Sequence, residues 1–120
     1  MKQFRFLGWK VYGDAQNLFS KILITVNKLP KEYRFELSSQ IIRSTLSIIL
    51  NIAEGGGKES DKELNRFIDI ALGSAYETLA GLDTLFRNKL IKEEEFLSFQ
   101  EDIANICSQL GGFRRKIKKE

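Results

Sequence analysis

The sequence predicts an all-α fold, a bundle of four helices joined by short connections. In four successive segments, apolar residues recur at steps of three and four, the spacing of one face of an α-helix. No segment alternates apolar and polar residues over enough positions to predict a strand. Proline occurs once in 120 residues, so long helices are permitted almost everywhere.

The first two helices are expected on either side of Pro30, which ends the first one. The apolar face of the first helix consists of Tyr12, Ala15, Phe19, Ile22, Val26 and Leu29. The second helix is expected to begin after Ser38, a residue type that caps helix N-termini, and to run to Glu54. We expect the glycines at 55–57 to close it, because glycine tolerates the left-handed conformation beyond a helix end.

The third helix is expected to begin at a capping box, because Ser60 and Glu63 have the Ser-x-x-Glu spacing. Its apolar positions, which run to about Asn88, are Leu64, Phe67, Ala71, Ala75, Leu82 and Leu85. Those of the fourth helix are Phe96, Phe99, Ile103, Ile106, Leu110, Phe113 and Ile117. The second and third helices are expected to form an antiparallel hairpin through the glycine turn.

Composition excludes several functional classes. The chain has no histidine, which excludes histidine acid–base catalysis and Ser-His or Cys-His nucleophile pairs. No convergent set of carboxylates, lysines or tyrosines takes their place, so we expect a protein that is not an enzyme and holds no metal or cofactor. The single Cys107 allows no internal disulfide and fits a reducing cytoplasm. Because no stretch approaches ~20 apolar residues and the N-terminus lacks a signal-peptide core, we expect neither a membrane span nor export.

The second helix carries a polar stripe within an otherwise apolar run. The stripe, which spans an arc of roughly 80° at ~100° per residue, consists of Gln40, Arg43, Ser47, Asn51 and Glu54. Apolar residues fill roughly 200° of the remainder, more than the ~100° that packing on one side of a bundle needs. We therefore expect the surplus, with Ile49 and Leu50, to contact another copy of the protein. The alternative is a helix buried deeply between three neighbours.

The third helix offers a matching face of polar and small residues. In the expected hairpin, Asn51 and Glu54 come near Arg66, while Arg43 comes near Ser74 and Glu77. The predicted polar network, within one chain or across a subunit boundary, consists of Arg43, Ser47, Asn51, Glu54, Arg66, Ser74 and Glu77. Such a network mainly fixes register and pairing, because desolvation offsets much of its Coulomb energy. A ligand-binding polar pocket is the alternative.

The same residues carry a resemblance to a known family. The matching positions are Arg43, Ser47, Ile48, Asn51, Ile52, Ala53, Glu54, Gly55, Ser60, Glu63, Arg66, Phe67, Ala71, Gly73, Ser74 and Glu77, with Trp9, Val11, Tyr12, Ala15 and the turn Leu29-Pro30-Lys31 upstream. On these residues the chain resembles the four helix bundle protein family. Its members include proteins encoded within intervening sequences of bacterial 23S ribosomal RNA genes, sometimes filed as ribosomal proteins. The chain departs from the pattern at Gly56, where members often carry an aromatic residue, and at Ile49 and Leu50, where proline or a small residue is common.

The resemblance implies an antiparallel up-and-down four-helix bundle, one domain over residues 1–120, that assembles into a homopentameric ring. The family is also similar to the accessory variability determinant of diversity-generating retroelements, a pentamer that binds nucleic acid and a reverse transcriptase. No catalytic residues are established for the family. The motif residues therefore carry over as structural or interface positions.

The charge distribution favours a nucleic-acid partner. Residues 61–113 hold ten acidic and five basic side chains, whereas residues 114–120 hold five basic and one acidic. A ring would repeat this basic tail around its surface. The candidate contacts to RNA or DNA are Arg114, Arg115, Lys116, Lys118 and Lys119, with Lys2, Arg5 and Lys10. A solvated helix end is the simpler interpretation of the tail.

Three functional classes follow. The first is an oligomeric accessory protein linked to ribosomal RNA intervening sequences that binds RNA or DNA. The second is a structural or protein-interaction scaffold without nucleic-acid binding. The third, a carboxylate-based enzyme or small-ligand binder, is disfavoured by the missing histidine.

Overall fold

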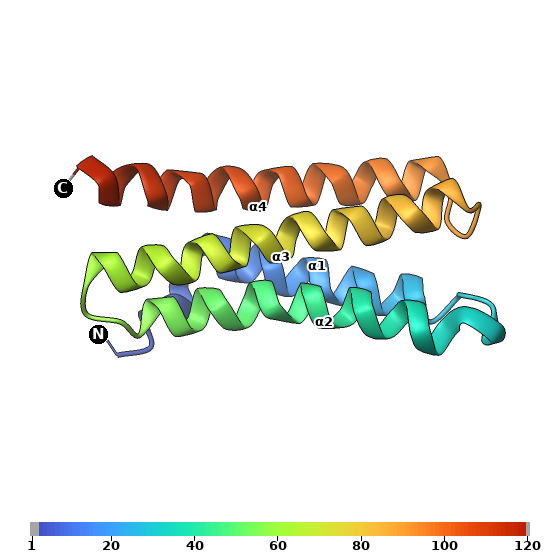
Figure 1. Cartoon of the computed structure of the whole chain (residues 1–120), viewed down its shortest axis with the longest axis horizontal. Coiled ribbons are helices and arrows are strands. Elements are labelled where there is room, and N and C mark those ends of the chain that lie inside the picture. Colours follow the sequence, from blue (N-terminus) through green and yellow to red (C-terminus); the bar gives the residue numbers. More distant parts are fainter. Residues whose placement is uncertain (1–2, 120) are drawn as a thin grey trace.

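The chain folds into four long helices that run alternately up and down, as predicted (Figure 1). The computed structural model describes residues 3–119, without the side chains of residues 115 and 117–119. The helices are α1 (Lys10–Val26), α2 (Lys31–Gly56), α3 (Asp61–Arg87) and α4 (Glu93–Lys119), preceded by a short 3-10 turn, η1 (Arg5–Gly8). No strand occurs within residues 3–119. The described chain therefore has the all-α architecture that its apolar periodicity predicts.

The core runs along the length of the bundle, where the apolar faces of all four helices meet. Its largest fully buried side chains include Leu18, Ile22, Ile48, Ile52, Ile68, Leu82, Phe99, Ile103, Ile106 and Leu110. Each contributes about 1.5–3 kcal/mol through burial. Ile49 is also buried, at 4% exposure, so its predicted place in the apolar surplus is wrong, whereas Leu50 is 53% exposed.

The predicted apolar face of the first helix is confirmed at Ala15, Ile22, Val26 and Leu29, but at two other positions the fully buried residue is the one before. Val11 and Leu18 are buried, whereas Tyr12 and Phe19 are only half-buried. The Tyr12 ring packs edge-on against Phe6, with 5.0 Å between ring centroids, and its hydroxyl accepts a hydrogen bond from the Gln16 amide. Aromatic residues with a polar tip favour such positions between core and solvent.

The second helix starts eight residues earlier than predicted, at Lys31 instead of after Ser38. The Pro30 carbonyl accepts the first helical hydrogen bonds, from the backbone N–H groups of Tyr33 and Arg34. Proline suits a helix start because it lacks the N–H that would have no partner there. Ser38 is instead buried within α2, and its hydroxyl has no hydrogen-bond partner among the described residues.

The glycines that end α2 serve close packing and do not adopt left-handed geometry. Gly57 has a φ of −87°, so the expectation of a left-handed cap is wrong. A Cβ on Gly55 would lie 3.0 Å from Cβ of Phe67 on α3, and one on Gly56 would lie 3.0 Å from Cβ of Phe6. The missing side chains therefore let the end of α2 approach both α3 and the N-terminal segment.

The ends of α3 are well defined. Its start confirms one half of the predicted capping box, since the Glu63 backbone N–H donates to Ser60 Oγ at 3.1 Å. The Glu63 carboxylate pairs instead with Arg66. At its other end Lys89 has a φ of 61°, and the Leu90 N–H donates to the Leu85 carbonyl, as in a Schellman motif. Of the described residues, no helix is both long and apolar enough to cross a membrane.

Candidate functional site

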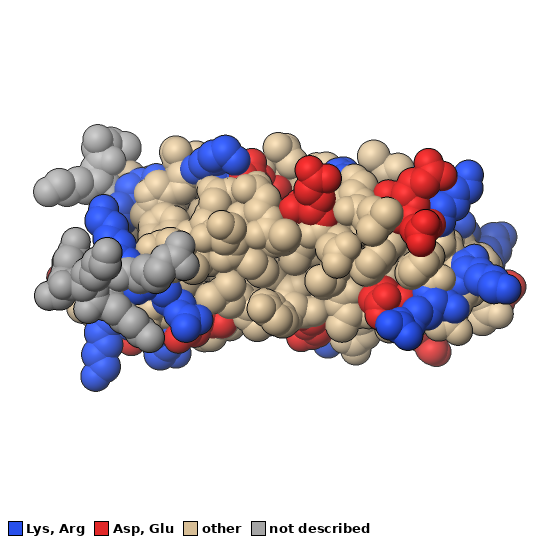
Figure 2. Space-filling view, turned by 90° about the horizontal axis from the view of Figure 1, so that it is seen from above, with Lys and Arg blue, Asp and Glu red and all other residues tan. Residues whose placement is uncertain are grey.

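The two ends of the described chain and the α2–α3 turn lie at the same end of the bundle (Figure 1). Basic side chains from these three segments gather there, and Figure 2 shows them on the face seen from α4. We call this the basic end; its described members are Arg5, Lys10, Lys58, Lys62, Arg66, Arg114 and Lys116. The other predicted contacts, Lys2, Arg115, Lys118 and Lys119, lie outside the described side chains. Sequence reasoning missed Lys58 and Lys62, because only the fold brings the turn beside the termini.

Arg5 is the best anchored cation of the basic end. Its Nε donates to the Gly56 carbonyl at 2.9 Å, and its guanidinium lies over the Trp9 ring, 5.4 Å from the centroid. The last carbonyls of a helix lack partners within the helix and attract cations. Arg5 therefore fastens the N-terminal segment to the end of α2, and this internal role competes with a direct contact to phosphate.

Several other cations of the basic end also have partners. Lys10 Nζ lies 2.7 Å from Asp14 Oδ2, and Arg114 Nη1 lies 3.1 Å from Asp69 Oδ1. These side chains remain 73% and 40% exposed, respectively, so both cations face solvent. Lys62 and Lys116 are exposed and take part in no ion pair among the described residues. They are the described cations most available to a phosphate.

Small polar side chains join α2 to α3 along a line that we call the polar seam: Ser44, Ser47, Asn51, Ser74 and Thr78. The hydroxyls of Ser47 and Ser74 lie 2.7 Å apart, and Asn51 Nδ2 donates to both the carbonyl and Oγ of Ser47. Ser44 and Thr78 form a second hydroxyl pair at 2.8 Å, fully within the bundle. The structure thus brings together Ser47, Asn51 and Ser74 of the predicted network.

The charged part of the predicted network does not form within the described chain. Arg66 Nε pairs with Glu63 Oε2 at 3.1 Å on its own helix, and not with Glu54. Arg43, Glu54 and Glu77 are exposed and make no ion pair among the described residues. The short serine and asparagine side chains let the helices touch along the seam, while the long charged side chains project outward. Helical spacing predicted the correct faces of α2 and α3 but not which charged side chains pair.

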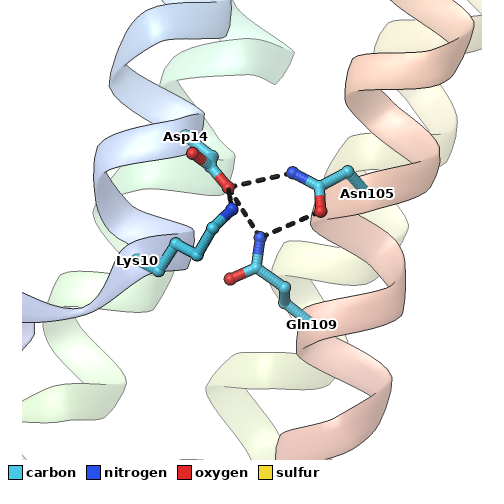
Figure 3. A network of polar contacts seen from close by, with 4 residues as sticks. All are labelled: Lys10, Asp14, Asn105 and Gln109. Atoms are coloured by element: carbon cyan, nitrogen blue, oxygen red, sulfur yellow. Dashed lines mark hydrogen bonds and ion pairs between the residues drawn. The ribbon is translucent and has the colours of Figure 1, made fainter.

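A second polar cluster joins α1 to α4 (Figure 3). A single carboxylate oxygen, Asp14 Oδ2, accepts from Lys10 Nζ at 2.7 Å, Asn105 Nδ2 at 2.9 Å and Gln109 Nε2 at 2.7 Å. The Lys10 hydrogen bond, with the two amide donors, lowers the pKa of Asp14 below its ordinary value and outweighs the effect of burial. This cluster, which sequence reasoning missed, fixes the register of α4 against α1.

The remaining polar groups offer little chemistry. Burial raises the pKa of the Cys107 thiol, which disfavours the reactive thiolate. Among the described residues, no group of three or more Cys, Asp or Glu side chains is placed to hold a metal ion. The clusters bind helices to each other, whereas the basic end presents exposed charge to solvent.

The matches to known proteins agree with the predicted family. The family model described as 23S rRNA-intervening sequence protein matches residues 8–112. Among solved structures, a protein with unknown function from the S23 ribosomal protein family of Bacteroides thetaiotaomicron VPI-5482 superposes with a TM-score of 0.81. The two share 28% sequence identity over 87% of this chain and 97% of that one. No curated protein matches the sequence. With the family model spanning residues 8–112, the chain belongs to the 23S rRNA-intervening sequence protein family.

Proposed function

We propose that this protein is a non-catalytic accessory protein that assembles into a homo-oligomer, a pentameric ring, and binds RNA or DNA through its basic end. The observation that carries the proposal is the convergence of cations from three distant segments, the N-terminal segment, the α2–α3 turn and the end of α4, on one end of the bundle. Figure 2 shows Lys and Arg there, and others at the opposite end. Lys62 and Lys116, for example, are 54 positions apart in the sequence and both exposed at that end. The name of the family, which refers to 23S rRNA, makes structured RNA the first nucleic acid to test.

Assembly would increase the effect of this charge. If the bundles of a ring stand parallel, every basic end lies on the same rim, and their potentials add. Phosphate contacts of this kind position a nucleic acid without reading its bases. The proposal therefore predicts binding that depends strongly on salt and weakly on sequence.

The non-catalytic half of the proposal has two supports. The chain has no histidine, which removes the commonest general base at neutral pH. The described buried polar side chains mainly form hydrogen bonds within a helix or between two helices, as in the Ser44–Thr78 pair. Neither the polar seam nor the Asp14 cluster presents a nucleophile beside a base.

The test is fluorescence anisotropy with structured RNA and with duplex DNA at several salt concentrations. The variant Lys62→Gln/Lys116→Gln removes two exposed charges of the basic end. Its matched control, Lys89→Gln/Lys92→Gln, removes two exposed charges at the α3–α4 turn, at the opposite end (Figure 1). We expect the first pair to weaken binding and flatten the salt dependence, and the control to bind like the wild type. Equal effects of the two pairs would contradict a localised interface.

A protein-interaction scaffold is the second candidate, and a separate observation favours it. Large apolar side chains are exposed on α1 and α2, among them Ile24 at 61%, Phe35 at 82% and Leu50 at 53%. Exposed apolar patches mark surfaces that bind other proteins. No binding of nucleic acid at low salt would leave this scaffold role as the function.

A further inference from the structure

An open groove lies at the end of the bundle opposite the basic end, between the end of α1 and the start of α2. We call it the α1–α2 groove; its volume is about 1030 Å³, and its lining includes Leu23, Ile24, Lys28, Lys31, Arg34, Phe35 and Ile42. Phe35 is 82% exposed and Leu23 43% exposed. Neither side chain is needed for the core of the single chain. Their grouping creates the kind of apolar surface that a partner covers.

The rim of the groove is basic. Lys28 and Lys31 are exposed and form no ion pair among the described residues. The only hydrogen bond that the Arg34 side chain makes among the described residues is from its Nε to the Leu29 carbonyl, at 3.3 Å. An occupant that covers the apolar floor and carries carboxylates would pair with these cations as well.

The chain itself carries a surface of that chemistry at the start of α4. We call it the acidic α4 edge: Glu93, Glu94, Leu97 and Glu101. Leu97 is 52% exposed, with acidic side chains before and after it. None of the three glutamates forms an ion pair among the described residues. The edge is thus apolar at its centre and acidic at its margin, the complement of the groove.

The two surfaces lie at the same end of the bundle. The α1–α2 turn and the start of α4 are both far from the chain termini (Figure 1), and acidic side chains lie over that half of the molecule in the view from α4 (Figure 2). Two copies that stand side by side and point the same way can therefore bring the groove of one against the edge of the other. An antiparallel pair would instead bring the basic rim of one copy toward the basic end of the other.

We infer that the α1–α2 groove of one copy receives the acidic α4 edge of a second copy. Leu97 enters the apolar floor beside Phe35, and Glu93 and Glu94 face the cations of the rim. The inference rests on the proposed homo-oligomer and names its contact surfaces. Because the groove and the edge are different surfaces, the contact is heterologous and closes into a ring when the rotation between copies permits. All basic ends then face the same side.

The first test measures mass in solution by light scattering. Phe35→Glu should dissociate the oligomer, raising its dissociation constant by more than about tenfold, because an aromatic anchor becomes a charge. Tyr76→Glu is the matched control, since Tyr76 is 71% exposed but lies on α3, outside both surfaces. Circular dichroism checks that both variants keep their helices.

Charge exchange makes the test specific. Lys31→Glu and Glu94→Lys should each weaken assembly, whereas the double variant should restore it, since the pair is again of opposite sign. A wild-type protein that is monomeric at micromolar concentration would defeat the proposed assembly and, with it, this interface. An oligomer that survives both Phe35→Glu and Lys31→Glu would overturn the interface alone.

Cysteine cross-linking distinguishes the partner surfaces. In a Cys107→Ser background, the double variant Phe35→Cys/Leu97→Cys should give a ladder of disulfide-linked chains under oxygen, whereas each single variant should stay monomeric on a non-reducing gel. Cross-linked dimers of Phe35→Cys alone would show groove against groove and overturn the inference. Absence of the ladder in an oligomer, together with binding of an added acidic amphipathic peptide to the groove, would also overturn it in favour of a different protein partner.

Discussion

Ser47 on α2 and Ser74 on α3 share a hydrogen bond of 2.7 Å between their hydroxyl oxygens. A bond between such short side chains brings the two backbones close together, and Asn51 extends it by donating to Ser47. The next hydroxyl pair, Ser44 and Thr78, lies fully within the bundle. These bonds fix the register of α2 against α3, because a shift of one residue would leave buried hydroxyls without partners.

The polar seam predicts energetic coupling between its two serines. In a double-mutant cycle, Ser47→Ala and Ser74→Ala should show a coupling free energy of about 1 kcal/mol, the usual contribution of one hydrogen bond. Urea denaturation of the wild type, both single variants and the double variant measures it. Strictly additive effects would show that the bond contributes nothing to stability.

Arg66→Ala should cost little stability. The Arg66–Glu63 pair lies on the surface, with side chains 58% and 46% exposed, so its loss should reduce the free energy of unfolding by less than about 1 kcal/mol. Arg87→Ala removes a comparable surface pair, with Asp83, and should have a similar effect. A loss of about 3 kcal/mol, the usual cost of breaking a buried pair, would place Arg66 in a network that the single chain does not show.

Ser38→Ala should stabilise the protein. The Ser38 hydroxyl is buried without a hydrogen-bond partner among the described residues, and alanine has the higher helix propensity, so the free energy of unfolding should rise by about 1 kcal/mol. Ser39→Ala is the control, because the Ser39 hydroxyl donates to the Phe35 carbonyl. Thermal or urea melts compare the two. A destabilised Ser38→Ala would mean that this hydroxyl has a partner in solution.

The Asp14 cluster predicts a dependence of stability on acid. Because the pKa of Asp14 is lower in the folded chain than its ordinary value of 3.8, folding favours the ionised carboxylate. The Asp14 carboxylate therefore stabilises the fold at pH values above its ordinary pKa, and this stabilisation disappears as the pH falls through the lower pKa of the folded chain. Asp14→Asn should remove this part of the acid dependence, and Gln109→Ala should reduce it. Urea melts between neutral and acidic pH measure the difference, and identical profiles for all three proteins would contradict the assignment.

The sequence predicts the positions of helices better than it predicts which residues contact one another across them. Apolar periodicity identified most of the buried positions of α3 and of α4, because burial on one face imposes that spacing, but it missed Ile68. It misplaced the start of α2, since both Pro30 and Ser38 are good residues for a helix start, and residues 31–37 contain no buried side chain whose spacing would have indicated the longer helix. The Arg5–Gly56 bond joins residues 51 positions apart, and no local pattern signals it.

Removal of the tail tests the proposed nucleic-acid interface with least damage to the fold. The Phe113 ring packs against Trp9, with 4.9 Å between centroids, and Arg114 pairs with Asp69, so truncation after Gly112 would also remove packing. Truncation after Arg114 keeps both of these interactions and deletes the remaining tail cations, Arg115, Lys116, Lys118 and Lys119.

The truncated protein should bind nucleic acid more weakly at low salt and should show a flatter log–log salt plot. Each phosphate that is no longer neutralised lowers the slope by ~0.9 for duplex DNA or ~0.7 for a single strand, and a ring multiplies this by the number of subunits that touch the nucleic acid. Anisotropy between roughly 50 and 200 mM salt covers the range where such an effect is apparent. Light scattering must show the same oligomer before and after truncation, because dissociation alone would also weaken binding. Unchanged affinity and slope would exclude the tail and leave Lys62 and its neighbours at the α2–α3 turn as the remaining candidates.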